Sequence, residues 1–291
     1  MISTISQMCR VRLNIAYLGG GFHGWASQPG LRTVQGELEA ALAQVLHIPA
    51  GRVVLTVAGR TDAGVHATGQ VAHFDVPAAV WEALPGRAAV SPPEALVRKV
   101  NAVLARGCPG VRGYTDVVVN SARQVPETFD ARFSALWRAY TYRIADGPAR
   151  WRPQRPDVLW VAAPLDVSLM NRAAQPLLGE HDFLSYSKPR PGASTVRTLQ
   201  RLEVIREEGI VCVHARADAF CHSQVRTLVG TLAEVGRGAK DVGWPQRRLL
   251  ERSRTGEVKV APAHGLTLES VGYPPPGEYA SQALRARRYR G

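Results

Sequence analysis

Residues 58–76 read AGRTDAGVHATGQVAHFDV, and the first half of the chain is arranged around this stretch. The preceding segment VVLTVA (53–58) has the β-branched composition of a strand, and Ala72, Phe74 and Val76 alternate as the residues of a second strand do. The connection between them is longer and richer in polar groups than a hairpin requires. We therefore expect two strands joined by a loop with a function of its own.

The pattern extends outward from this loop on both sides. Upstream, the alternation between residues 11 and 17 predicts a strand, and Thr33 is placed to cap the helix that follows it. Downstream, Pro92 and Pro93 can open a helix that Gly107 closes, and a strand is expected near residues 114–119. The order is β-α-β-β-α-β, which is the ferredoxin-like split unit.

The same order recurs after an expected loop at 120–127. A strand carries apolar and aromatic residues on one face, and it is followed by a helix, two strands separated by a Glu-Gly turn, a second helix and a last strand. The segments are a strand with Leu136, Arg138, Tyr140, Tyr142 and Ile144, a helix near 170–177, strands near 199–206 and 210–217, a helix near 225–232 and a strand at 266–273.

The repeat predicts an α+β protein made of two ferredoxin-like halves with pseudo-two-fold symmetry. We expect an N-terminal half at 10–120, a C-terminal half at 121–275 and a basic, flexible tail at 276–291. A cleft between two such halves is a common place for a ligand site.

The charge balance points to a polyanionic partner. Among 291 residues there are 36 Lys and Arg against 24 Asp and Glu, a formal net charge of +12. Cationic side chains bind nucleic acids by releasing counterions from the phosphates. The sequence contains no apolar run long enough to span a membrane, no signal peptide at MISTISQMCR and no clustered cysteines among its four, so we expect a cytoplasmic protein with reduced thiols.

Within the loop, Asp62 is the one carboxylate near the tip, and Arg60 lies two residues before it. A carboxylate beside a guanidinium can serve catalysis. Residue types alone equally allow Asp62 to cap its own loop in an Asx-turn.

Five separated segments resemble motifs of the tRNA pseudouridine synthase A family, and together they cover roughly residues 10–275. The most specific is the loop itself, which matches the family signature around its catalytic aspartate. The segments are GFHGWASQPGLRTVQGELEAAL (21–42), GRTDAGVHATGQVAHFD (59–75), FDARFSALWRAYTYRI (129–144), LLGEHDFLSY (177–186) and AFCHSQVRTLVGTLAEVG (219–236).

This resemblance implies a fold in which two ferredoxin-like halves join in one mixed, mainly antiparallel sheet. It implies an isomerase that converts uridine to pseudouridine at positions 38, 39 and 40 of the tRNA anticodon stem-loop, acting as a homodimer without cofactor or metal. Asp62 matches the catalytic nucleophile, Arg226 the arginine that pairs with it, and Tyr140 the tyrosine that stacks on the target base. Attack on C6 of the base and a glycal intermediate at the ribose both remain open.

Four further residues match substrate-binding positions or are candidates for them. Arg60 matches a residue that helps extrude the target nucleotide, and Val225 matches an apolar residue that floors the uracil pocket; His66 and Arg138 are candidate RNA contacts. From their own patterns, Tyr140 and Val225 fit a core, Arg226 fits an exposed phosphate contact or surface charge, and the histidines fit structural roles. The roles of His73, His222 and the C-terminal basic segment stay open.

The chain departs from the family pattern at Ala139, where a second arginine is common, and at Gln224, where a methionine is common. Neither position belongs to the expected chemistry.

Two other classes of protein would also fit parts of the pattern. A metal-dependent nuclease could use Asp62, His66, His73 and Asp75 as ligands, and its activity would be lost on adding a chelator. A non-catalytic RNA-binding module would explain the charge but not the set of Asp62, Tyr140 and Arg226, and product analysis would identify it.

Overall fold

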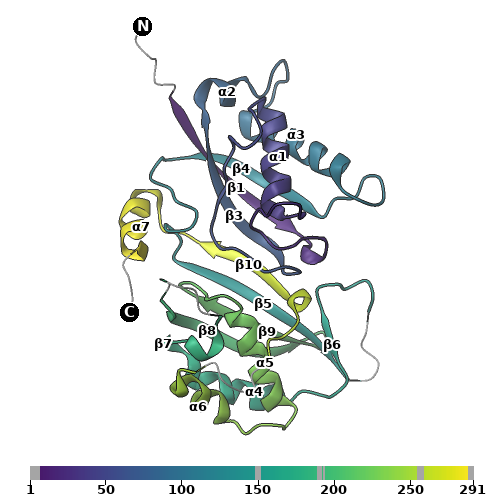
Figure 1. The fold of residues 1–291 in the computed structure, drawn as a ribbon, viewed down its shortest axis with the longest axis vertical. Coiled ribbons are helices and arrows are strands. Elements are labelled where there is room, and N and C mark those ends of the chain that lie inside the picture. Colours follow the sequence, from purple (N-terminus) through teal and green to yellow (C-terminus); the bar gives the residue numbers. More distant parts are fainter. Residues whose placement is uncertain (1–6, 148–151, 189–191, 193, 254–258, 288–291) are drawn as a thin grey trace. The chain divides into compact units, whose positions relative to one another are not determined.

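The computed structural model describes residues 7–147, 152–188, 192, 194–253 and 259–287. These residues form two compact units (Figure 1). Unit 1 comprises the described residues up to Ala135 together with Tyr273–Arg287, and unit 2 comprises those from Leu136 to Gly272.

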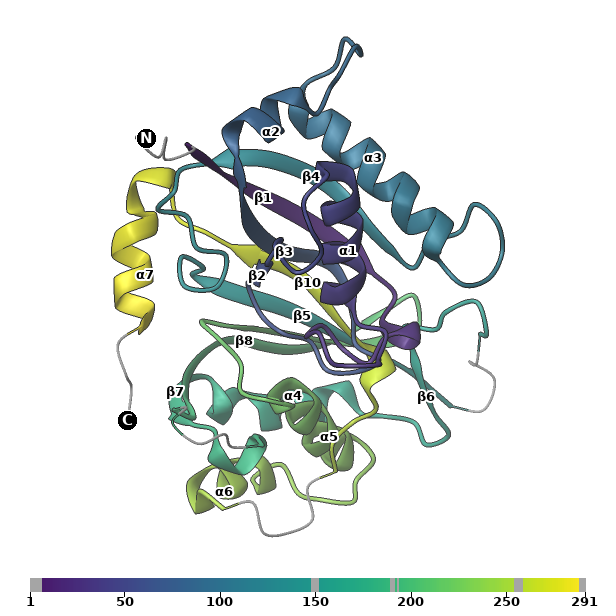
Figure 2. The ribbon, with the colours of Figure 1, turned by 45° about the horizontal axis from the view of Figure 1, so that its top comes forward.

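Unit 1 contains an antiparallel sheet with the strand order β4-β1-β3-β2. Helices α1 and α3 pack against each other and cover this sheet (Figure 2). Its elements are β1 (Met8–Tyr17), η1 (Gly19–Gly21), α1 (Val34–Leu46), β2 (Thr56–Val57), β3 (His66–Pro77), α2 (Ala78–Ala83), α3 (Pro92–Gly107), β4 (Val117–Val125), η5 (Pro276–Glu278) and α7 (Tyr279–Arg287).

In unit 2 the strands follow the order β10-β5-β9-β8-β7, and the short strand β6 is parallel to β5. Helices α4 and α5 pack against each other, and α6 packs on both. Its elements are β5 (Trp137–Asp146), β6 (Leu159–Val161), α4 (Val167–Ala174), η2 (Gln175–Leu177), β7 (Gly179–Asp182), η3 (Leu184–Tyr186), β8 (Val196–Glu207), β9 (Ile210–Ala217), α5 (Gln224–Gly236), α6 (Trp244–Glu251), η4 (Ala263–Gly265) and β10 (Leu266–Gly272).

The two units repeat one topology. The four main strands in chain order are β1, β2, β3 and β4 in unit 1 and β5, β8, β9 and β10 in unit 2. In both units their order in space is fourth, first, third, second. In both, the crossover helices follow the first and third of these strands. The predicted α+β class and the doubled β-α-β-β-α-β order are therefore confirmed.

Local sequence signals begin and end several elements where they were expected. The Thr33 side chain accepts a hydrogen bond from the Gly36 amide at the start of α1. Ser91 donates from its amide and its hydroxyl to Glu94, which starts α3. Glu208 and Gly209, both at positive φ, form the tight turn between β8 and β9.

Two strands of unit 1 differ from the prediction. Of the strand expected at 53–58, Thr56–Val57 pair with β3, and the Ala58 amide donates to the Val71 carbonyl of β3. Pairing starts late because the amide of Leu55 donates to Glu39 on α1 instead (2.8 Å). Strand β4 lies later than expected, since Asp116 binds the Arg32 guanidinium before the strand starts. It then pairs with β1 as far as Val125, within the expected loop.

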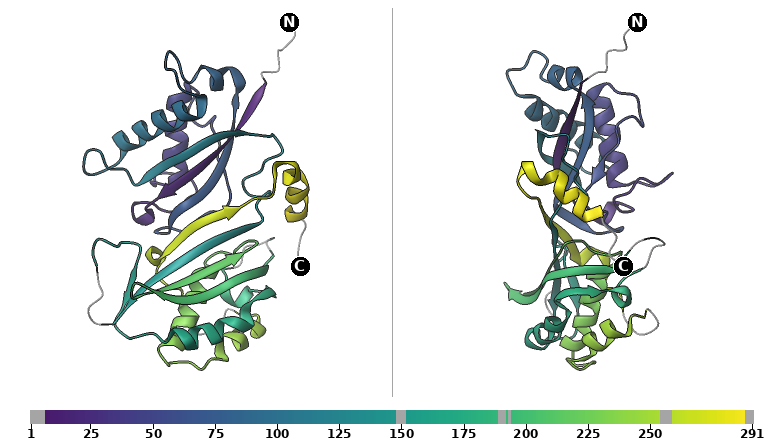
Figure 3. Two further views of the ribbon diagram at one scale, coloured as in Figure 1. Left: turned by 180° about the vertical axis from the view of Figure 1, so that it is seen from behind. Right: turned by 90° about the vertical axis from the view of Figure 1, so that its left-hand side faces the viewer.

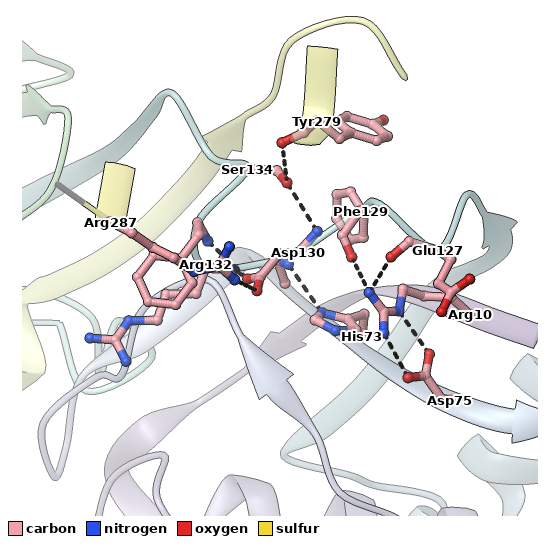
Figure 4. A network of polar contacts seen from close by, with 12 residues as sticks. Arg10, His73, Asp75, Glu127, Phe129, Asp130, Arg132, Ser134, Tyr279 and Arg287 are labelled. Atoms are coloured by element: carbon pink, nitrogen blue, oxygen red, sulfur yellow. Dashed lines mark hydrogen bonds and ion pairs between the residues drawn. The ribbon is translucent and has the colours of Figure 1, made fainter. Parts of the chain in front are cut away.

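The segment before β5 belongs to unit 1, so the boundary lies at 135/136 rather than at 120/121. Figure 4 shows how it is held. Arg10 on β1 donates to the carbonyls of Glu127 and Phe129 and binds Asp75 through both carboxylate oxygens (2.7 Å each). These contacts tie the segment to β1 and β3.

The C-terminal segment expected to be a flexible tail contains the helix α7, yellow in Figure 3. Tyr279 is buried, with its ring 5.0 Å from that of Phe129, and its carbonyl accepts from Ser134. Arg287 at the end of the helix binds Asp130 (3.1 Å). A buried aromatic ring, a hydrogen bond and an ion pair thus hold this segment on unit 1. Residues 288–291 lie outside the described part.

Among the described residues, no helix combines the length and apolar character needed to cross a membrane. All four cysteines are free thiols.

Candidate active site

The loop that carries Asp62 is held by a buried polar network in unit 1. The hydroxyls of Tyr17 on β1 and Thr61 lie 2.8 Å apart. The amide of Gln70 on β3 donates both to the Tyr17 oxygen (3.2 Å) and to the carbonyl of Gly59 (2.9 Å). Gln70, Tyr17 and Thr61 are 0%, 4% and 7% exposed. The loop backbone is therefore fixed on both sides of Arg60, and Asp62 follows directly.

The N-terminal segment after β1 packs on the same loop at backbone distance. A Cβ at Gly19 would lie 2.1 Å from the Val65 carbonyl oxygen, and one at Gly24, whose φ is +89°, would lie 3.0 Å from the Thr61 oxygen. That oxygen also accepts the amide of Trp25 (3.1 Å). Glycine is required at these two positions because a side chain would push the loop away.

Asp62 is half-buried and Arg60 is exposed. The Asp62 carbonyl accepts the Val65 amide (3.2 Å), which closes the tip of the loop. The structure thus presents a carboxylate and a guanidinium on a short, anchored turn. That arrangement suits a loop that acts on a substrate.

Two buried histidines of unit 1 accept hydrogen bonds from the backbone. His66 Nδ1 accepts the Gly19 amide (2.9 Å), and His73 Nδ1 accepts the Ala131 amide (3.0 Å). Burial lowers the pKa of His73, and the positive charge of Arg10 lowers it further. Both rings are 6% exposed or less. For His66, predicted to contact substrate, the structure shows an anchoring role.

The described residues contain no group of three or more His, Cys, Asp or Glu side chains arranged to hold a metal ion. Asp75, one of the ligands considered for a nuclease, is bound by Arg10, which lowers its pKa. Three of the four ligands considered for a nuclease, His66, His73 and Asp75, thus accept hydrogen bonds from groups of the fold.

In unit 2, Tyr140 and Arg138 lie on the central strand β5, between β9 and β10. The Tyr140 ring meets Phe220 edge-on, with centroids 5.3 Å apart, and is 8% exposed. The Arg138 guanidinium donates to the Asp218 carbonyl (2.7 Å) and is equally buried. Arg138, predicted to bind substrate, therefore fixes the segment between β9 and α5, from which Phe220 reaches Tyr140.

Helix α5, which packs against β5, carries Val225 and Arg226 in its first turn. Gln224 accepts the Cys221 amide (2.8 Å), so this departure from the family pattern closes the turn that leads into the helix. Val225 is 4% exposed, and Arg226 is half-buried. The Arg226 Nε donates to the Ala261 carbonyl (2.7 Å), which fixes the plane of the guanidinium.

A strap at residues 259–262 holds this arginine against the sheet. The Ala261 amide returns a hydrogen bond to the Arg226 carbonyl, and the Tyr142 hydroxyl donates to the Pro262 carbonyl (2.8 Å). Burial raises the pKa of Tyr142, while the nearby Arg226 charge opposes that rise. Tyr142 on β5 and Arg226 on α5 thus donate to the carbonyls of two adjacent residues of the strap.

The predicted residues fall into two groups. Unit 1 carries Arg60, Asp62 and His66 on one continuous segment, and unit 2 carries Arg138, Tyr140, Val225 and Arg226 on β5 and α5. Sequence reasoning missed Tyr17, Gln70 and the strap. A tyrosine at the end of a strand with alternating apolar residues is expected in the core. Its contact with the loop follows only from the fold.

Comparison with known proteins agrees with the motifs. A family model described as tRNA pseudouridine synthase matches residues 173–274. The tRNA pseudouridine synthase A of Leifsonia xyli subsp. xyli is 49% identical over 290 residues, covering 98% of each chain. That of Frankia casuarinae is 49% identical over 97% of this chain and 96% of its own. That of Streptomyces griseus is 46% identical over 97% and 94%. The chain belongs to the tRNA pseudouridine synthase A family.

Proposed function

We propose that this protein isomerises uridine to pseudouridine in tRNA, at positions 38, 39 and 40 of the anticodon stem-loop. The observation that carries the proposal is identity of 49% over 98% of the chain to a protein named tRNA pseudouridine synthase A, with the Asp62 loop intact. The buried network around that loop supports it, because the network holds the backbone next to Asp62 in one conformation.

The reaction is an isomerisation and is balanced without redox chemistry. The bond between C1′ of the ribose and N1 of uracil breaks, the base turns, and C1′ bonds to C5. The proton at C5 is lost, and N1 gains one. Because no electrons enter or leave, no redox cofactor is needed. We further propose that the enzyme uses no other cofactor and no metal.

Asp62 is proposed as the nucleophile, in its ionised form. It would add to C6 of the base or assist departure of the base from the ribose. Arg226 is proposed to pair with this carboxylate and to keep it charged. The hydrogen bond from Arg226 Nε to the Ala261 carbonyl supports that role, since it fixes the orientation of the guanidinium group.

Three residues are proposed to place the base. Arg60, exposed on the loop, would take part in extruding the nucleotide from its stack. Tyr140 would stack on the uracil ring, and Val225 would provide an apolar floor. The edge contact of Phe220 supports a fixed plane for Tyr140.

His66 and Arg138 are proposed to act on the substrate indirectly, by fixing the segments that touch it. We further propose a homodimer in the cytoplasm, with tRNA as partner. The net charge of +12 supports a phosphate-rich partner.

The test uses the wild-type protein with an unmodified tRNA transcript carrying uridine at positions 38 to 40, in the presence of a chelator. Three further transcripts each replace one of these uridines with cytidine. Pseudouridine is mapped by carbodiimide labelling and primer extension. Stops at each of the three positions, lost singly in the matching transcript, are expected. Cleaved RNA, or bound RNA without product, would contradict the proposal.

A further inference from the structure

The buried tyrosine of β1 lies where it can control the catalytic loop without touching substrate. Tyr17 is 4% exposed, and its hydroxyl is 2.8 Å from the hydroxyl of Thr61, the residue immediately before Asp62. Gln70 donates to the same oxygen at 3.2 Å. The Tyr17 hydroxyl therefore joins β3 to the loop through one shared atom.

The network holds the loop at two residues that flank Arg60. Gln70 binds the Gly59 carbonyl on one side, and Tyr17 binds the Thr61 side chain on the other. The Thr61 carbonyl is held separately by the Trp25 amide. Thr61 is thus held through both its side chain and its carbonyl, which fixes the backbone from which the Asp62 side chain starts. The orientation of the nucleophile thus depends on the network.

We propose that Tyr17, together with Gln70, is a positioning residue that holds the Asp62 and Arg60 loop in its reactive conformation. The inference rests on the proposed function, in which Asp62 attacks the uridine. Catalysis requires a nucleophile held close to its attack geometry, and displacement of about 1 Å can cost roughly a hundredfold in rate.

The chemistry of the network suits a fixed support and not a proton donor. Burial raises the pKa of Tyr17 to about 12, although its hydrogen bonds to Thr61 and Gln70 act in the opposite direction. The hydroxyl is therefore protonated at every pH at which the reaction is measured. Loss of the hydroxyl should lower the rate without moving the pH profile.

The test compares Tyr17→Phe with a matched control, Tyr186→Phe. Tyr186 is also fully buried, and its hydroxyl donates to the Pro245 carbonyl (2.7 Å) in unit 2. Each substitution removes one buried hydroxyl that is hydrogen-bonded. We expect both variants to lose a few degrees of melting temperature, and only Tyr17→Phe to lose kcat.

The expected fall in kcat for Tyr17→Phe is about 10- to 100-fold, or about 1.4 to 2.8 kcal/mol of barrier, with KM for tRNA within about twofold of wild type. Thr61→Val should reproduce this loss, and Thr61→Ser, which keeps the hydroxyl, should restore most of the activity. The double variant Tyr17→Phe, Thr61→Val should lose little more than either single one, because both remove the same bond.

Wild-type activity separates the two claims. If wild type makes product and Tyr17→Phe has the same kcat, the positioning role is overturned and the proposed function stands. If wild type makes no product, the function itself is overturned. A rise in KM without a fall in kcat, an equal fall in Tyr186→Phe, or a shifted pH profile in Tyr17→Phe would each overturn the inference.

Discussion

At the scale of single residues, several polar side chains are committed to the backbone of the fold. His73 accepts the Ala131 amide, Arg138 donates to the Asp218 carbonyl, and Arg226 donates to the Ala261 carbonyl. Buried donors and acceptors need such partners, because an unmade hydrogen bond costs about 1 to 3 kcal/mol. The bonds of Arg138 and Arg226 fix segments that carry or adjoin a proposed catalytic residue.

The neutral state of His73 predicts a specific dependence of stability on pH. Burial, followed by the charge of Arg10, lowers the folded pKa below the ordinary value of 6.5. Above 6.5 neither folded nor unfolded chain binds the proton, so this histidine adds no slope. Below 6.5 the unfolded chain binds it first, and stability falls as pH falls until the folded pKa is reached.

The measurement is the free energy of unfolding between pH 7.5 and 5 for wild type and His73→Gln, whose amide can still accept from Ala131. Wild type should lose up to about 1.4 kcal/mol per pH unit more than the variant below pH 6.5. His214, whose pKa is also lowered by burial, is present in both proteins and cancels. Parallel curves would show that His73 is not held neutral by the fold.

At the scale of elements, the site depends on close backbone contact between the segment after β1 and the Asp62 loop. Gly19 lies in η1 and leaves no room for a methyl group, whereas a Cβ at its neighbour Gly20 would meet nothing within 4 Å. The two positions form a natural pair of test and control.

We expect Gly19→Ala to lower the free energy of unfolding by about 2 kcal/mol or more, because a rigid carbonyl 2.1 Å away must move. Gly20→Ala should change it by less than about 0.5 kcal/mol. Chemical denaturation of both variants measures the difference. Equal stabilities would mean that the segment does not pack on the loop as described.

Elements with local signals were predictable from sequence, and those that depend on distant contacts were not. The cap at Thr33, the helix from Pro92 and the Glu208–Gly209 turn follow from residues within a few positions of each other. The late start of the strand expected at 53–58 depends on Glu39, and the order of α7 depends on Phe129. Neither partner is visible from the local pattern.

The candidate site divides in the same way. Asp62, Tyr140 and Arg226 could be named because their motifs are distinctive. The residues that hold the Asp62 loop could not be named from sequence, since Tyr17 and Gln70 look like ordinary members of alternating strands. They gain their role only where β1 and β3 pair. For His66 and Arg138, whose contact with substrate stays a prediction, residue type alone did not show which backbone group each side chain binds.

At the scale of the whole molecule, the chain repeats one strand order twice and divides the proposed chemistry between the copies. Unit 1 carries Asp62 on the connection between β2 and β3, and unit 2 carries Tyr140 on its first strand and Arg226 on its second crossover helix. Neither half alone holds the full set of side chains. A fold built from two similar halves thus has dissimilar roles for them.

The central claim is that Asp62 carries out pseudouridine formation in tRNA. Asp62→Asn keeps the size of the side chain and removes the nucleophilic charge. Asp241→Asn is the matched control. The Asp241 carboxylate is exposed and binds the Arg247 guanidinium, and its substitution makes the same change in net charge.

Both variants and wild type are incubated with the unmodified tRNA transcript, and pseudouridine is mapped at positions 38 to 40. We expect product from wild type and Asp241→Asn at similar rates, and a loss of at least about 10³-fold in Asp62→Asn with tRNA still bound. Product from Asp62→Asn at the wild-type rate, in a preparation free of contaminating enzyme, would contradict the account.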